Sequence, residues 1–163
     1  MKAGQGAAGF LGLSLLAFLV SMPARAQETV HGANSLFVSP TLKIAWAVRK
    51  GTTEETTTVV IRVVNSTGAY RQIGLDGVDP FSKQRTTLVA AQPLATLIDL
   101  SISRARFAEY PSCEIQLYQS EQLPTDRHPN LTVFYLGVPD TTPEFATAQA
   151  MEEYFTKVVW RAK

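Results

Sequence analysis

Short runs of β-branched and apolar residues, separated by polar turns, restrict the fold of this chain more than any other feature. Residues 57–64 (TTVVIRVV) are β-branched at almost every position, which restricts χ1 and favours an extended strand over a helix. Residues 42–48 and 113–119 alternate between apolar and other side chains, with the period of a strand that buries one face. The remaining runs that indicate strands lie at residues 70–75, 86–91, 94–102 and 131–138.

Seven short strands with no helical pattern between them favour a mainly β fold. Parallel sheets built from alternating β and α units would need an amphipathic helix after each strand. We therefore predict an antiparallel immunoglobulin-like β-sandwich over residues 36–140, followed by a C-terminal amphipathic α-helix. Tyr110 lies three residues before Cys113 at the entry to a late strand, a spacing one residue longer than that of the tyrosine corner of such sandwiches.

The first 26 residues have the pattern of a secretory signal peptide. Lys2 provides a positive start, residues 10–22 are continuously apolar, and residues 23–26 (PARA) provide the small residues of a cleavage site. This apolar run is shorter than the roughly 20 residues that span a bilayer. We predict that residues 1–26 are cleaved, that the protein is exported to the periplasm or the extracellular medium, and that no stable membrane anchor remains.

The charge composition argues against nucleic acid as a partner. Without residues 1–26, the fifteen basic residues become thirteen, against fourteen acidic ones, and no run of like charge exceeds two residues. Binding to nucleic acid depends on clustered cations that displace counterions from phosphates. We therefore predict no nucleic-acid binding.

The two segments that flank the predicted sandwich differ in character. Residues 27–35 (QETVHGANS) are polar and unpatterned, so we predict a flexible entry segment. At the other end, residues 142–144 (TPE) supply an N-cap candidate, a proline at the first helical position and an acidic residue near the positive end of the helix dipole. A helix over residues 141–163 would carry one apolar stripe, formed by Phe145, Ala148, Met151, Phe155, Val158 and Ala162.

This helix needs an apolar surface to pack against, and the strand at residues 131–138 offers one. Its Phe134, Leu136 and Val138 alternate with inward-facing residues and so point away from the core. We predict that the helix packs on this outer face as a cap; the alternative is a helix that binds a partner elsewhere. The candidate ligand or partner surface is formed by Phe134, Leu136, Phe145, Met151 and Phe155.

Catalytic and metal-binding chemistry lacks a recognisable motif. Cys113 shares a strand face with apolar residues and is predicted to be a buried hydrophobe, with an intermolecular disulfide or a reactive thiol as alternatives. His31 lies in the predicted flexible entry segment and His128 in a loop flanked by proline, so neither is held rigidly as a catalytic base must be. Asp76 and Asp79 bracket a glycine in an ordinary turn, with too few oxygen ligands for calcium. We predict no catalytic residues, cofactor or metal.

Three functions are compatible with these features. The leading hypothesis is an exported, non-catalytic module that binds another exported or envelope protein, using the edge strands or loops of the sandwich. The second is a binder of a small apolar ligand between helix and sheet, lined by aromatic residues, namely Phe134, Tyr135, Phe145, Tyr154 and Phe155. The third is an enzyme without a recognisable motif, whose site would be assembled from Asp99, Arg104, Arg106 and Glu109.

Overall fold

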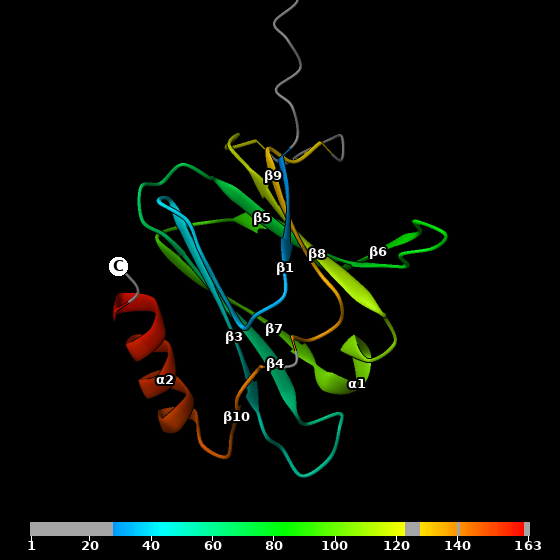
Figure 1. Cartoon of the computed structure of the whole chain (residues 1–163), viewed down its shortest axis with the longest axis vertical. Coiled ribbons are helices and arrows are strands. Elements are labelled where there is room, and N and C mark those ends of the chain that lie inside the picture. The colour runs from blue at the N-terminus through cyan, green and yellow to red at the C-terminus, as the bar shows by residue number, and fades with distance from the viewer. Residues whose placement is uncertain (1–27, 123–127, 140, 162–163) are drawn as a thin grey trace, which may run out of the picture.

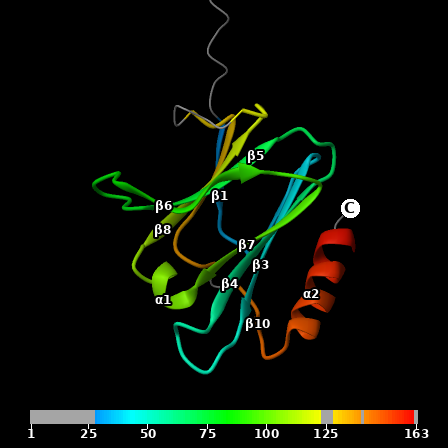
Figure 2. The ribbon, with the colours of Figure 1, turned by 180° about the vertical axis from the view of Figure 1, so that it is seen from behind.

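The chain folds into two five-stranded sheets and a C-terminal helix (Figures 1 and 2). The computed structural model describes residues 28–122, 128–139 and 141–161, so the predicted leader lies outside the described residues. The first sheet has the order β1 (Glu28–Gly32), β9 (Leu131–Tyr135), β8 (Ser112–Tyr118), β5 (Gln72–Val78) and β6 (Arg85–Pro93). The second sheet has the order β10 (Glu144–Phe145), β3 (Leu42–Arg49), β4 (Thr58–Asn65) and β7 (Leu97–Ser103), and β2 (Leu36–Val38) also pairs with β3. The helices are α1 (Arg104–Phe107) and α2 (Ala148–Arg161).

The main core lies between the two sheets. Trp46 of β3 is fully buried and meets Tyr135 of β9 edge to face, with ring centroids 4.9 Å apart. Phe107 of α1 packs against the same indole at 5.8 Å. Aromatic pairs in this geometry add about 0.5–1.5 kcal/mol to the free energy of area burial. The predicted mainly β fold with two sheets and a C-terminal helix is therefore confirmed.

All seven predicted strands are present, and three short strands were missed. The seven correspond to β3 through β9, and the pairings between them are antiparallel. Of the missed strands, β1 pairs with β9 in parallel and β10 pairs with β3 in parallel. These short strands, like β2, lie at the sheet edges and depend on backbone pairing, so they leave no periodic pattern in the sequence.

The flexible entry segment predicted at residues 27–35 is wrong for residues 28–32, which form β1. Gly32 explains part of this ordering, because a Cβ at this position would lie 2.2 Å from the ring of Tyr135. The absence of a side chain lets β1 approach β9 closely. The sandwich therefore begins before residue 36.

The helix begins seven residues later than the predicted start at residue 141. Residues 142–147 are not helical: the amide of Val48 donates to the carbonyl of Pro143 (2.9 Å), and that of Lys50 donates to Phe145 (2.8 Å), as β10 joins the sheet. The helix starts at Ala148, and the hydroxyl of Thr147 accepts a hydrogen bond from the amide of Ala150 (3.1 Å). Pairing with an open strand edge thus overrides the N-cap signal at residues 142–144.

The predicted packing of the helix on strand 131–138 is also wrong. α2 covers the outer face of the second sheet, where buried apolar side chains from β3, β4 and α2 form a second cluster: Ala45, Ala47, Val60, Val64, Phe155 and Val159. The outer face beside β9 is polar instead, since Phe134 lies opposite Glu114 and Thr132 lies opposite Gln116. Apolar β3 and β4, with alanines that leave room for Phe155, are the better match for the helix.

Within the described ranges, no helix is long and apolar enough to cross a membrane.

Candidate functional site

The five residues predicted to form one ligand or partner surface lie in two separate places. Phe134 is half-buried on β9 and Leu136 follows that strand with 72% of its surface exposed. Phe145, Met151 and Phe155 belong to β10 and α2 on the second sheet, where Phe155 is fully buried. The structure therefore divides the predicted surface between the two sheets.

The proposed cleft between helix and sheet is filled by side chains. Phe155 and Val159 are each at most 1% exposed beneath α2, and Tyr135 lies in the main core between the sheets. A depression of about 420 Å³ lies between β10 and α2, lined partly by Phe145 and Tyr154. The five aromatic residues considered for an apolar ligand thus do not line one cavity.

Arg62 attaches α2 to the second sheet. Its guanidinium donates two hydrogen bonds of 2.8 Å to Asp99 of β7 and two of 2.7 Å to Glu152 of α2. The same group lies 4.5 Å from the ring centroid of Phe155. The hydrogen bonds that Arg62 donates to the two carboxylates, first to Asp99 and then to Glu152, raise its pKa. A lone arginine in an otherwise apolar strand was the sequence signal for this part-buried ion-pair network, which was not predicted.

Acidification is expected to loosen α2. The hydrogen bond from Arg62 lowers the pKa of Glu152 below its ordinary value of 4.5. A depressed pKa contributes stability that is present above the unfolded-state pKa and is lost as pH falls through the folded-state pKa. Hydrogen exchange of α2, corrected for intrinsic rates, should therefore accelerate between pH 5 and pH 3 relative to β4. The variant Glu152→Gln should lack this pH dependence; an identical profile in both proteins would contradict the assignment.

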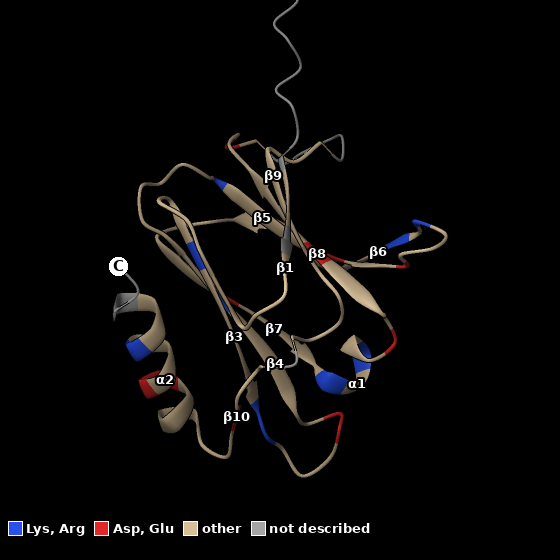
Figure 3. Cartoon of the chain, viewed as in Figure 1, with Lys and Arg blue, Asp and Glu red and all other residues tan. Residues whose placement is uncertain are grey.

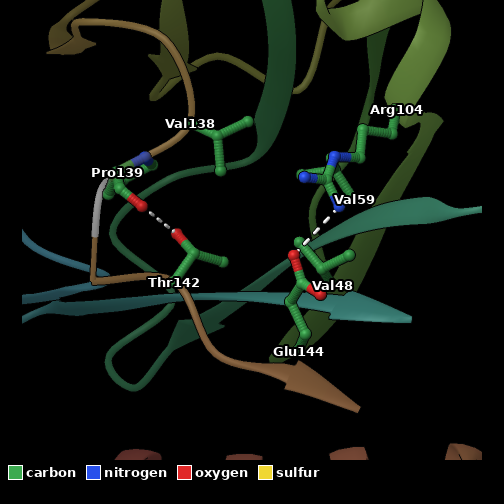
Figure 4. Close-up of a pocket in the computed structure, with 7 residues that line it drawn as sticks. All are labelled: Val48, Val59, Arg104, Val138, Pro139, Thr142 and Glu144. Atoms are coloured by element: carbon green, nitrogen blue, oxygen red, sulfur yellow. Dashed lines mark hydrogen bonds and ion pairs between the residues drawn. The ribbon is translucent and has the colours of Figure 1, made fainter. Parts of the chain in front are cut away.

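A small pocket of about 210 Å³ lies at one end of the sandwich (Figure 4). It is lined by Val48, Val59, Val138, Pro139 and Thr142, and by Arg104 and Glu144, which are joined by a hydrogen bond of 2.9 Å. Arg104 also pairs with Glu54 at 3.4 Å. Ligand sites for drug-sized molecules are typically about 300–1,000 Å³, so this pocket accommodates only a small group.

The outer face of the first sheet carries a buried polar network. The carboxylates of Asp76 and Glu114, on opposed strand positions, are 5% and 6% exposed. Arg85 lies between them, 2.5 Å from Glu114 and 3.9 Å from Asp76, and the amide of Gln116 donates to Asp76 at 2.8 Å. Tyr118 in turn donates to Gln116 at 3.1 Å. Asp76 was predicted in a turn, but it belongs to β5 and to this network.

The two sides of the sandwich end in different kinds of strand. On one side the edges are β1, β2 and β10, of five, three and two residues. On the other side the edges are β6 and β7, of nine and seven residues, joined across the sheets by residues 94–96. No described strand pairs with the outer edge of β6 or β7. We call this second side the open side.

The two strands of the open side differ in regularity. β7 pairs with β4 residue by residue from Leu97 to Ser103 without interruption. β6 shows two register shifts against β5, and its first part leaves the body of the sandwich as a projecting hairpin (Figures 1 and 2). Such irregularities bend a strand and weaken it as a template for pairing. The straight, continuous edge is therefore that of β7.

The tip of the β5–β6 hairpin presents an aromatic ring to solvent. Phe81 is 94% exposed, and its amide donates to the side chain of Asp79 at 2.8 Å. The amide of Ser82 donates to the same oxygen at 3.1 Å, and these hydrogen bonds lower the pKa of Asp79. Lys83 adopts a left-handed conformation with φ of 61°, which costs a residue with a Cβ roughly 1 kcal/mol. This tip was not predicted; its sequence signal is an aromatic residue after Asp79-Pro80 in a polar loop.

The residues considered for catalysis do not converge. Asp99 is bound to Arg62, Arg104 to Glu144, and Arg106 to Glu109 within α1 and its flank. His128 is exposed, and the segments that the structure describes contain no group of three His, Cys, Asp or Glu side chains placed to hold a metal ion.

Burial in the core keeps two ionisable side chains, Cys113 and Tyr135, in their neutral forms. Cys113 is fully buried, as predicted, and burial raises the pKa of its thiol well above the ordinary range. Burial also raises the pKa of Tyr135 to about 12, which the nearby Trp46 indole only partly opposes. Neither group is therefore ionised near neutral pH, as a nucleophile would need to be.

Charge is distributed without a dominant sign over the described surface (Figure 3). Basic and acidic segments alternate along the chain, and both signs occur on α2 and on the β5–β6 hairpin.

Comparison with known proteins gives no family model and no curated protein that matches this chain.

Proposed function

We propose that this protein is an exported, non-catalytic module that binds another exported or envelope protein by accepting a strand at the edge of β7. The observation that carries the proposal is the difference between the two sides of the sandwich. Three short strands cover one side, whereas β7 leaves seven residues of continuous edge open. Soluble proteins usually shorten, charge or cover such edges. An edge left long and regular is the surface that strand addition uses.

The side chains of β7 support this role. Leu97, Asp99 and Ser101 are exposed along the strand, and the only charged one, Asp99, is held by Arg62. The edge therefore lacks the lysine or proline that discourages pairing. Export is supported by the signal-peptide pattern of residues 1–26.

We further propose that the sandwich is immunoglobulin-like. The strand neighbours support this assignment: β3, β4 and β7 correspond to strands A, B and E, and β5, β8 and β9 to strands C, F and G. Tyr110 supports it further, because its ring packs where a Cβ of Gly77 would lie, 2.5 Å away, at the start of β8. This arrangement leaves no strand beyond β7 on its free edge within the described chain.

The test is a loss of binding on charging the β7 edge. The partner is cross-linked and co-purified from the exported fraction of source cells, identified, prepared as a pure protein, and titrated calorimetrically. The double variant Leu97→Lys/Ser101→Lys should bind at least about tenfold more weakly. Val38→Lys, which adds a charge at a 45% exposed position on the opposite side, is the matched control and should bind normally. Equal binding by both variants, or recovery of the free monomer alone, would refute the proposal.

A further inference from the structure

We infer that Phe81 is the anchor residue of this interface, and that the partner is a folded protein with an apolar pocket rimmed by acidic side chains. The inference rests on the proposed protein-binding function. Phe81 is 94% exposed, against 42–72% for the other exposed large hydrophobic residues of the described chain. Aromatic residues that enter a desolvated pocket are the usual energetic centres of protein interfaces.

The hairpin tip holds Phe81 in a defined position before any partner binds. The carboxylate of Asp79 accepts the amides of Phe81 and Ser82, and the carbonyl of Asp79 accepts the amide of Lys83 at 2.9 Å. The amide of Asp79 donates in turn to Gln84 at 3.0 Å. A ring presented on an ordered turn loses little conformational entropy on binding.

The backbone at Lys83 supplies an independent observation. Its φ of 61° is favourable for glycine, yet the position carries a long basic side chain that is exposed. Strained backbone conformations of this kind cluster at functional sites and ligand clamps. Next to an exposed aromatic ring, an unburied ammonium group fits a pocket whose rim is acidic.

The position of the hairpin favours a folded partner. The hairpin precedes β6, and β6 connects directly to β7, so both features belong to the open side. An extended peptide paired with β7 has no pocket to receive a ring on the neighbouring hairpin, whereas a folded domain supplies both surfaces.

The alternative binding partner for the hairpin tip is a membrane surface, but the charges at the tip do not favour binding to lipid. Arg85 is paired with Glu114, so Lys83 is the cation that remains for anionic lipid beside the one ring. Each surface cation and each single apolar group contributes only weak membrane binding, and stable attachment needs at least two strong signals.

The experiment titrates the identified, purified partner with the mature protein and three variants. Phe81→Ala should weaken binding roughly 10- to 100-fold. Lys83→Gly should weaken it about two- to fivefold while its melting temperature stays equal or rises, because glycine removes the strain at this position. Leu136→Ala, at the 72% exposed residue, is the control and should bind normally.

The outcomes separate this inference from the proposed function. If the β7 double variant binds weakly but Phe81→Ala and Lys83→Gly bind normally, the anchor is refuted and strand addition stands. If all three bind normally, both proposals fail. A benzoylphenylalanine photo-cross-linker at position 81 should couple to the partner; coupling only to a second copy of this chain, or to nothing, overturns the inference. Sedimentation with phosphatidylglycerol vesicles that is lost in Phe81→Ala would assign the tip to lipid and overturn it as well.

Discussion

Replacing Phe155 by alanine is expected to lower the free energy of unfolding by about 3–5 kcal/mol, as truncation of buried aromatic residues does. Phe155 is fully buried beneath α2, and the residues that face it include Ala45 and Ala47, whose side chains are too short to fill the resulting cavity. The variant also removes the ring that lies 4.5 Å from the guanidinium of Arg62. Two of the attachments of α2 to the second sheet are thus lost together.

Urea unfolding followed by circular dichroism measures this loss. Thr156→Ala, at the adjacent exposed position of α2, is the control and should change stability by less than about 0.5 kcal/mol. Hydrogen exchange should show that protection falls first in α2 of Phe155→Ala and later in the sheets. A loss below about 1 kcal/mol would mean that the helix contributes little to the fold.

Replacing Arg85 by methionine is expected to cost about 3 kcal/mol, because it leaves two buried carboxylates without their cation. Asp76 and Glu114 lie opposite each other on β5 and β8, at 5% and 6% exposure. Like charges directly opposed across a sheet are destabilising. Arg85 is partly exposed itself, so the cost arises mainly from the carboxylates that it leaves behind.

A double variant separates this explanation from a loss of packing. Arg85→Met/Glu114→Gln removes one charge of each sign and should recover much of the stability lost in Arg85→Met. Arg71→Met, which breaks a 3.9 Å ion pair between two exposed side chains, should be nearly neutral. If Arg85→Met is as neutral as Arg71→Met in thermal unfolding, the network does not stabilise the sheet.

Local periodicity predicted the large elements of this fold but not the way they meet. The seven strands from β3 to β9 carry local signals, namely alternation or runs of β-branched and apolar residues, and these strands form because each contributes side chains to the main core. The helix was predicted from its stripe, but its start was placed at residues 142–144, whereas residues 144 and 145 form β10 and the helix begins at Ala148. Pairing with β3 is a contact between residues almost a hundred positions apart, and no local signal reports it.

The candidate surface was the least predictable part. Apolar residues such as Phe155 and Phe145 were predicted to be available for a ligand or partner. In the structure, Phe155 is buried between α2 and the second sheet, and Phe145 is partly buried against the same cluster. Phe81 lies in a loop without periodicity, and only the three-dimensional arrangement shows that its ring has nothing over it. The solvent exposure of one side chain depends on how all the other residues pack around it, so it cannot be predicted from local sequence patterns.

The one-sided openness of the sandwich also limits how far association can go. A protein with free strand edges on both sides can add copies indefinitely, as a growing fibril does. Here the side of β1, β2 and β10 offers only short strands, so a molecule that has received a strand at β7 presents no equivalent edge for the next. A strand added at β7 would therefore leave no second long, regular edge within the described residues, so pairing at this edge would stop after one step.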